Sequence, residues 1–268
     1  MEKLKTTLII QSTTLNVEDG EYVKDGVIYC ALCNTARSVT LDGRVYRCKC
    51  KCEAERAEAE RQAEREQLKA MDNAIRSERL RKMSLLGERY KHCRFGNSDI
   101  RRDASFVKAL ERCRRYCESA REVVRGGHGI YLYGKTGVGK THLVACMINE
   151  LIEKGYSCLI TNLQGLMHAR IRDEDGYDMA INVQFLFLDD IGTERMRKDG
   201  EDLWAQEVLY EVINSRYVSG KPTGFTSNYE IGELIRGRKI EQRTVERIYE
   251  MSSAVIEIGG GSYRVERM

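Results

Sequence analysis

The sequence lacks an apolar run long enough to cross a bilayer, which needs roughly 20 consecutive apolar residues, because charged residues make up 32% of its 268 positions. It also lacks the layout of a signal peptide, since the apolar segment at Leu8–Ile10 is too short for one. A strong excess of either charge is missing too: 44 basic and 41 acidic side chains leave a net charge of +3. We therefore expect a cytoplasmic protein without a membrane partner, whose function must be inferred from local motifs.

One segment fits the phosphate-binding pattern G-x-x-x-x-G-K-[ST] at every specified position. In this pattern the glycines let backbone N–H groups surround the phosphates of ATP, the lysine reaches the β and γ oxygens, and the hydroxyl helps to hold Mg²⁺. We therefore predict a nucleotide site made by Gly134, Lys135, Thr136, Gly137, Val138, Gly139, Lys140 and Thr141.

The flanking segments agree with that prediction. Gly129–Tyr133 is typical of a buried strand, and Thr141–Glu153 has the pattern of an amphipathic helix. Further along, the apolar run Phe185–Leu188 ends in two carboxylates, as expected for a central parallel strand that delivers acids to a nucleotide site (the Walker B strand). We predict that Asp189 holds Mg²⁺ and that Asp190 orients the attacking water. Alternatively, the two acids only end a strand and begin a turn.

Ten cysteines are present, and five of them lie in two close groups. Cys30 and Cys33 form the first group, and the second follows after an Asp-Gly turn. Two such pairs on neighbouring hairpins are typical of a zinc ribbon, in which thiolates bind one tetrahedral Zn²⁺. We assign the structural metal site to Cys30, Cys33 and Cys48, and we favour Cys50 over Cys52 as the fourth ligand; reduced thiols without a metal are the alternative.

Neither glycine nor proline occurs between Glu53 and Lys82, and the residues there are mostly strong helix formers. Eight acidic and eight basic side chains cancel in this segment. We expect one long charged helix, which serves either as a solvated spacer or as a docking arm for a partner protein. The predicted organisation is thus a zinc-ribbon-like module at 1–52, a charged helical linker at 53–88 and an ATPase domain at 89–268.

The second half alternates strands with helices, which predicts an α/β fold with a parallel sheet covered by helices. Several separate motifs resemble those of the DnaC/DnaI-type replicative helicase loaders, which are AAA+ P-loop ATPases of the IstB-like group. The resemblance covers roughly Tyr90 to Met268. It is carried by Tyr90–Phe95, Leu188–Gly192, Lys221–Asn228, Arg243–Ile248 and Ser262–Arg264.

The resemblance implies a five-stranded parallel sheet and an ATPase that binds a replicative DNA helicase through its N-terminal region. ATP turnover would control the release of that helicase onto single-stranded DNA. Asn228 matches the sensor-1 position that detects the γ-phosphate, and Arg264 matches the sensor-2 arginine. Arg247 matches the arginine finger that acts on a neighbouring subunit's ATP, which implies self-association through the ATP site.

Each of these three residues has a plainer alternative. Asn228 could cap a following helix, Arg247 could pair with Glu250, and Arg264 could lie on an edge strand.

The segment Leu163–Val183 is short for the extra helices with which loader ATPases grip single strands. Few aromatic side chains accompany the basic residues that would contact phosphates. These basic residues are His168, Arg170, Arg172, Arg195, Arg197, Lys198, Arg236, Arg238 and Lys239. An IstB-like helper of a DNA transposase, with the same ATPase motifs, is therefore the second hypothesis. A small-molecule kinase is a third, but it would need lid arginines that the sequence does not reveal.

Overall fold

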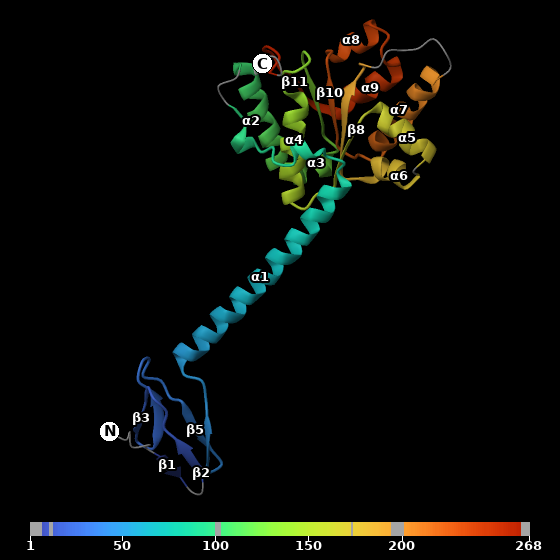
Figure 1. Ribbon diagram of the computed structural model, residues 1–268. Helices are drawn as coiled ribbons and strands as arrows, with labels where there is room; N and C mark the ends of the chain where they lie inside the picture. Colours follow the sequence, from blue (N-terminus) through green and yellow to red (C-terminus); the bar gives the residue numbers. More distant parts are fainter. Residues whose placement is uncertain (1–6, 11–12, 100–102, 173, 194–200, 264–268) are drawn as a thin grey trace. The chain divides into compact units, whose positions relative to one another are not determined.

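The computed structural model describes residues 7–10, 13–99, 103–172, 174–193 and 201–263 (Figure 1). The chain divides into two compact units, Met1–Asp72 and Asn73–Met268. The boundary lies inside the long helix α1 (Lys51–Met83). The last turns of α1 thus belong to the second unit, and the predicted linker at 53–88 spans the boundary between the two units.

The first unit consists of three antiparallel hairpins followed by α1. The strand pairs are β1 (Thr7–Ile10) with β2 (Thr13–Asn16), β3 (Glu21–Lys24) with β4 (Val27–Cys30), and β5 (Ser38–Leu41) with β6 (Arg44–Arg47). The second and third hairpins turn at Asp-Gly pairs in which both residues have positive φ. That conformation matches the right-handed twist of paired strands, and so the turn residues fix the strand register.

Helix α1 has 33 residues, none of them buried. Its alanines and long charged side chains favour the helix by local propensity rather than by packing. This confirms the predicted helix over Glu53–Lys82. Three apolar residues nearer its end, Leu68, Met71 and Ile75, are exposed.

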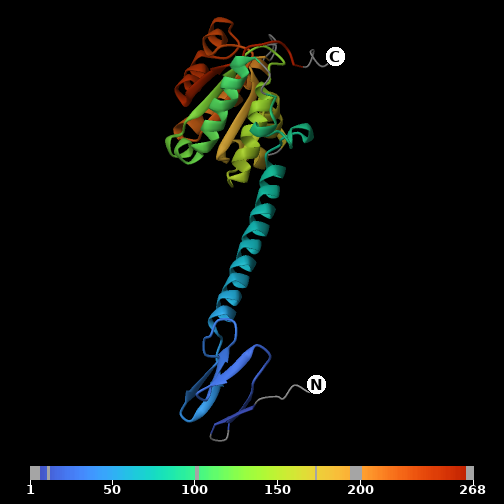
Figure 2. The same cartoon turned by 90° about the vertical axis from the view of Figure 1, so that its left-hand side faces the viewer.

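The second unit is built on five parallel strands in the order β11-β7-β10-β9-β8. Figure 2 shows this unit turned by 90° from the view of Figure 1. Their bounds are β7 (Gly129–Tyr133), β8 (Cys158–Thr161), β9 (Phe185–Ile191), β10 (Thr223–Ser227) and β11 (Ser252–Glu257). The predicted five-stranded parallel sheet is thereby confirmed. In such a sheet ligands bind beyond the carboxyl ends of the strands, where the strand order reverses.

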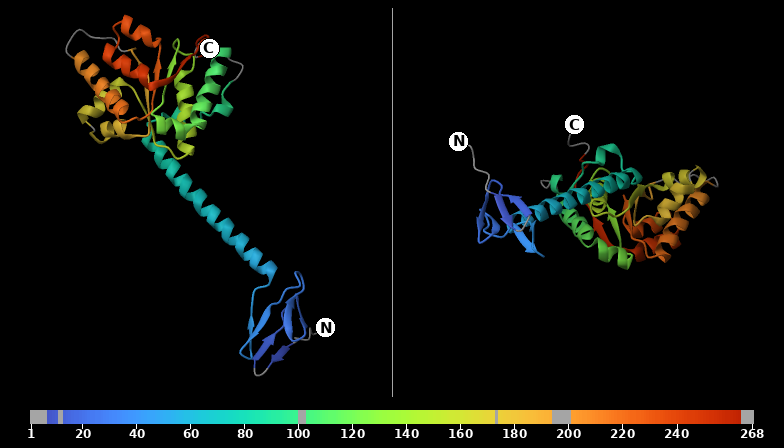
Figure 3. Two further views of the ribbon diagram at one scale, coloured as in Figure 1. Left: turned by 180° about the vertical axis from the view of Figure 1, so that it is seen from behind. Right: turned by 90° about the horizontal axis from the view of Figure 1, so that it is seen from below.

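Helices cover both faces of the sheet (Figure 3). On one face lie α2 (Ala104–Glu118), α3 (Ala120–Gly126) and α4 (Lys140–Glu153). The other face carries α5 (Leu163–Arg172), α6 (Glu174–Asn182), α7 (Glu201–Val218), α8 (Ile231–Arg236) and α9 (Gln242–Met251). Two short 3₁₀ helices, η1 (Glu88–Tyr90) and η2 (Phe95–Asn97), join α1 to α2.

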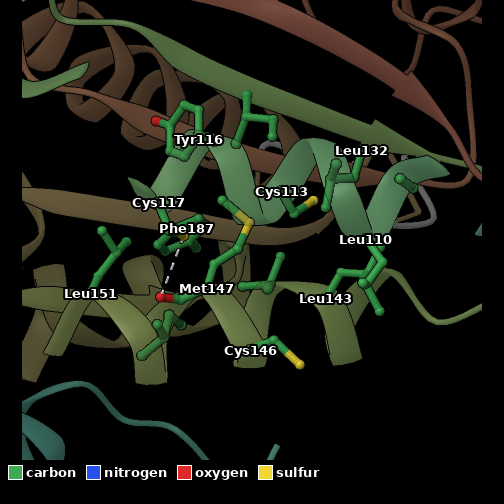
Figure 4. Close-up of a cluster of buried hydrophobic side chains, with 14 of the residues drawn as sticks. Leu110, Cys113, Tyr116, Cys117, Leu132, Leu143, Cys146, Met147, Leu151 and Phe187 are labelled. Atoms are coloured by element: carbon green, nitrogen blue, oxygen red, sulfur yellow. Dashed lines mark hydrogen bonds between the residues drawn. The ribbon is translucent and has the colours of Figure 1, made fainter. Parts of the chain in front are cut away.

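The core between α2, α4 and the sheet contains several cysteines (Figure 4). Cys113 and Cys117 of α2 face Met147 of α4, and Cys146 lies on the same helix. All three thiols are buried, and so is Cys158. Burial raises the pKa of Cys113 and Cys146 to about 12, so both remain protonated at neutral pH. These cysteines are small core residues.

None of the described helices combines the length and the apolar character that crossing a membrane requires.

Candidate functional site

The phosphate loop lies between β7 and α4, at the carboxyl edge of the sheet. Gly134, Gly137 and Gly139 have φ values of 151°, 88° and 109°, a region that favours glycine. At Gly134 a Cβ atom would lie 2.1 Å from the carbonyl oxygen of Ile258. The glycines are therefore required both by conformation and by space.

Lys140 begins α4, and its side chain turns back across the loop. Its Nζ donates hydrogen bonds to the carbonyl of Gly134 at 2.9 Å and to Oδ1 of Asn228 at 2.8 Å. Only 5% of Lys140 is exposed. Asn228 follows directly after β10, so two residues far apart in the chain meet at the same edge of the sheet.

Asp189, near the end of β9, faces two hydroxyl groups. Oγ1 of Thr226 donates to Asp189 Oδ1 at 2.6 Å, and Oγ1 of Thr141 donates to Oδ2 at 3.2 Å. Burial raises the pKa of Asp189, while the hydrogen bond from Thr226 opposes that shift. Nothing in our sequence analysis singled out Thr226. The available signal is its position in β10 two residues before Asn228, since residues i and i+2 of an extended segment lie on the same face.

Asp190 is exposed and has a φ of 56°, which is uncommon for a residue other than glycine. Its backbone N–H donates to Oγ1 of Thr226 at 2.8 Å. Thr226 thus contacts both acids and fixes the turn in which the strand ends.

A cavity of about 930 Å³ opens over the phosphate loop. The predicted residues Lys140, Thr141, Asp190 and Asn228 line it. Further lining residues that the sequence prediction missed come from two distant segments: Arg89, Tyr90, Cys93, Asn97, Ser98 and Asp99 before the loop, and Tyr263 near the C-terminus. The N–H of Tyr263 donates to the carbonyl of Gly137 at 3.1 Å. Tyr90, Cys93 and Tyr263 lie in segments that carry the family resemblance, but the sequence assigned them no role, because only the folded chain brings them to the loop.

Arg247 lies on α9, where its Nη1 is 3.2 Å from Oε2 of Glu250. Its guanidinium carbon also lies 4.3 Å from the centre of the Tyr217 ring. The pairing with Glu250 that the sequence offered as an alternative is thus present. Arg264 and the predicted phosphate contacts Arg195, Arg197 and Lys198 lie outside the described residues.

Two other basic residues considered for phosphate contacts interact within the fold. Arg170 lies 3.8 Å from a carboxylate oxygen of Glu211 and stacks over Tyr177 at 4.9 Å. Lys239 lies 4.2 Å from the centre of the Tyr229 ring. These contacts provide a structural explanation for both side chains.

In the first unit four cysteines converge: the Sγ atoms of Cys30, Cys33, Cys50 and Cys52 all lie within 4.8 Å of one another. Sulfur atoms around a tetrahedral Zn²⁺, with Zn–S bonds of about 2.3 Å, are separated by about 3.8 Å. The Sγ atoms of Cys30 and Cys52 are 3.7 Å apart. Four thiols at this spacing fit a zinc ion.

The grouping corrects the predicted ligand set, in which Cys48 stood in place of Cys52. Cys48 continues β6 in extended form, with its N–H bonded to the carbonyl of Arg37, and its thiol is exposed. Cys50 and Cys52 lie where the chain turns into α1, and this turn brings both thiols to Cys30 and Cys33.

Hydrogen bonds shift the pKa values of two thiols of the cluster in opposite directions. The hydroxyl of Thr35 lies 3.0 Å from Sγ of Cys33 and lowers the pKa of that thiol to about 5. Contact with Cys50 raises the pKa of Cys52 to about 12. A bound cation would favour the thiolate form of its ligands.

A protein-family model described as IstB-like ATP binding protein matches residues 45–268. The chain belongs to this family. The replicative helicase loader DnaI of Bacillus subtilis (strain 168) is 34% identical over 174 residues, which are 59% of this chain and 53% of that protein. The replicative helicase loader DnaC of Escherichia coli (strain K12) is 25% identical over 206 residues, 74% of this chain and 79% of that protein.

Among solved structures, a crystal structure of DnaI is similar with a TM-score of 0.53 and 26% identity, over 67% of this chain and 94% of that one. The chain thus spans about half the length of the Bacillus loader and most of the solved DnaI chain. These similarities confirm the expected AAA+ P-loop fold and the resemblance to helicase loaders.

Proposed function

We propose that this protein is an ATP-binding and ATP-hydrolysing loader that places a replicative DNA helicase on single-stranded DNA. The observation that carries the proposal is the meeting of Lys140, Thr141, Asp189 and Asn228 at one edge of the sheet. The names of the relatives supply the partner: the similar proteins of Bacillus and Escherichia are described as replicative helicase loaders.

ATP would be held by the backbone N–H groups of the phosphate loop and by the ammonium of Lys140. In this structure Lys140 donates to carbonyl and amide oxygens. Phosphate oxygens would compete for the same donors. The hydroxyl of Thr141 and the carboxylate of Asp189 supply the hard oxygen ligands that Mg²⁺ prefers, which supports their assignment to the metal.

Asp190 and Asn228 would act on the γ-phosphate side of the site. We assign the orientation of the attacking water to Asp190, whose exposed carboxylate lines the cavity. Asn228, which directly follows β10, would form a hydrogen bond with the γ-phosphate. A guanidinium adds charge stabilisation to phosphoryl transfer, and we assign this part to Arg247 of a neighbouring subunit and to Arg264.

The thiol cluster would hold Zn²⁺ and stabilise the hairpins, since so small a unit lacks a large core. We propose that this module and the exposed first part of α1 bind the helicase. The IstB-like transposase helper remains the second candidate, because it shares the ATPase motifs. The two functions differ in their protein partner and in the form of DNA that they use.

A binding experiment separates the two candidates. The purified replicative helicase of the same organism is mixed with the wild-type protein, with Cys30→Ser/Cys33→Ser and with Lys140→Ala, each with ATP, and complexes are resolved by size-exclusion chromatography with light scattering. The proposal predicts a helicase complex with the wild-type protein and none with the double cysteine variant. Absence of a complex with the wild-type protein removes the loader function but leaves the ATP site in place.

A further inference from the structure

The P-loop helix α4 presents one polar face to the segment that links α1 to α2. His142, Cys146, Asn149 and Glu153 recur at spacings of four, three and four residues, which places them in one stripe along a helix. The stripe begins beside the phosphate loop and ends at the last turn of α4. Each contact along it therefore connects the linking segment to the helix that holds the phosphates.

Asn149 is the centre of this stripe and is fully buried. Its Nδ2 donates to the carbonyls of Tyr90 and Cys93, both at 3.0 Å. Its Oδ1 accepts from Nη1 of Arg81 at 3.2 Å. A buried amide must satisfy both its donors and its acceptor, and here each of its three bonds goes to a different residue of the linking segment or α1.

The two residues that accept from Asn149 belong to the nucleotide cavity. Tyr90 and Cys93 line it together with Asn97 and Ser98. Ser98 in turn lies 2.9 Å from Nε2 of His142, the residue that follows Thr141. The cavity wall is therefore attached to α4 at two points.

The remaining partner, Arg81, belongs to the last turns of α1. Its Nη2 lies 3.4 Å from Oε1 of Glu153, and the same oxygen lies 2.9 Å from Nη2 of Arg94. Three residues after Arg81, directly beyond the end of α1, the carbonyl of Ser84 accepts from the N–H of Ile160 in β8 at 2.9 Å. The end of α1 is thus bonded to the sheet, to α4 and, through Asn149, to the cavity wall.

We infer that the last turn of α1 is part of the nucleotide site, with Asn149 as a positioning residue that joins Arg81 to the wall at Tyr90 and Cys93. The inference rests on the proposed ATP site. A nucleotide that orders the wall at Tyr90 and Cys93 also orders the end of α1, because the same hydrogen bonds connect them. By reciprocity, a change in the conformation or mobility of α1 changes the affinity for nucleotide. Since α1 also carries the thiol module, this is a route by which a partner bound there alters the ATP site.

The test replaces Arg81 with methionine and uses Arg79→Met, an exposed position of the same helix, as the matched control. Titration with a fluorescent ATP analogue measures affinity. The expected weakening for Arg81→Met is roughly 3- to 10-fold, the equivalent of one or two hydrogen bonds, with Arg79→Met unchanged. A second variant, Glu153→Gln, keeps the shape of the site and should show a smaller effect in the same direction.

Hydrogen exchange supplies a readout that a purely structural role does not change. ATP should slow amide exchange at residues 79–84 of the wild-type protein, and Arg81→Met should abolish this effect of ATP while residues 134–141 remain protected. Equal affinities for Arg81→Met and Arg79→Met, or exchange at 79–84 that is independent of ATP in the wild-type protein, would overturn the inference. A wild-type protein that does not bind the ATP analogue overturns the proposed function itself.

Discussion

The ammonium of Lys140 and the amide oxygen of Asn228 lie 2.8 Å apart, although 88 positions separate them in the chain. Lys140 begins the helix after β7, and Asn228 directly follows β10, the neighbouring strand in the sheet. The strand order therefore brings a phosphate-binding cation to the residue proposed to detect the γ-phosphate. This pair is the geometric basis of the proposed ATP site.

Replacing Lys140 with alanine should abolish detectable ATP binding or turnover, because the buried ammonium would be the main cation for the β and γ oxygens. Lys108→Ala provides the control, since Lys108 is an exposed lysine on α2. Isothermal titration with ATP and a phosphate-release assay measure the two properties. Equal binding and turnover by both variants would remove Lys140 from the site.

Replacing Asp189 with asparagine should lower turnover roughly 10- to 100-fold or more, as loss of a metal-holding group does, yet stabilise the nucleotide-free protein. Burial raises the pKa of Asp189 in the folded chain, so between its unfolded and folded pKa values the folded state binds more protons and stability falls as the pH rises. At neutral pH the buried charge is therefore a cost that asparagine removes. The advantage should shrink in urea unfolding experiments as the pH is lowered from 8 through the raised pKa of Asp189. An unchanged or lower stability of the asparagine variant at pH 8 contradicts this expectation.

Replacing Arg247 with alanine should leave ATP affinity intact and lower turnover, because the residue is proposed to act on a neighbouring subunit. The loss should appear at protein concentrations where wild-type turnover per subunit rises with concentration. Arg243→Ala is a close control: Arg243 also lies on α9 and stacks on a tyrosine, Tyr210, at 4.2 Å. Unchanged turnover in Arg247→Ala excludes the residue from the ATP site.

Replacing Cys52 with serine should lower the zinc content of the protein and reduce the strand signal of the first unit, whereas Cys48→Ser should retain both. The two cysteines are four residues apart, but only Cys52 lies in the four-thiol group. Elemental analysis and circular dichroism before and after chelator treatment provide the measurements. Zinc loss in Cys48→Ser alone would restore the ligand set expected from the sequence.

Replacing Arg216 with methionine should destabilise the second unit by about 3 kcal/mol or more, since each unsatisfied buried acceptor costs about 1–3 kcal/mol. Arg216 is fully buried, and burial lowers its pKa to about 9, which leaves it charged at neutral pH. Its guanidinium donates to the carbonyls of Ala180, Ile181, Val183, Gln184 and Pro222. Urea unfolding compares it with Arg114→Met at an exposed position of α2; equal stabilities would show that the buried bonds contribute little.

The phosphate loop, the strand before it and Asp189 could be predicted from the sequence because each is a contiguous pattern. The helix Lys51–Met83 could be predicted for the same reason: its local propensity is uniform over 33 residues. Relations between distant segments could not be predicted in this way. The cavity wall at Tyr90 and Cys93 and the pairing of Thr226 with Asp189 depend on which strands become neighbours.

The error at Cys48 has a local cause. Spacing alone placed Cys48 among the ligands and left Cys50 and Cys52 to compete for the fourth position. The direction of each thiol depends on where β6 ends and α1 begins, and boundaries of this kind are weakly encoded in sequence patterns.

The central claim is that ATP bound at Lys140 enables this protein to place a helicase on single-stranded DNA. The most direct measurement uses a closed single-stranded circle coated with single-stranded DNA-binding protein and carrying an annealed oligonucleotide, which the replicative helicase can release only after it has been loaded. We predict release with helicase, ATP and the wild-type protein, and none above the level of helicase alone with Lys140→Ala. Release that is equal with and without the wild-type protein would contradict the loader function.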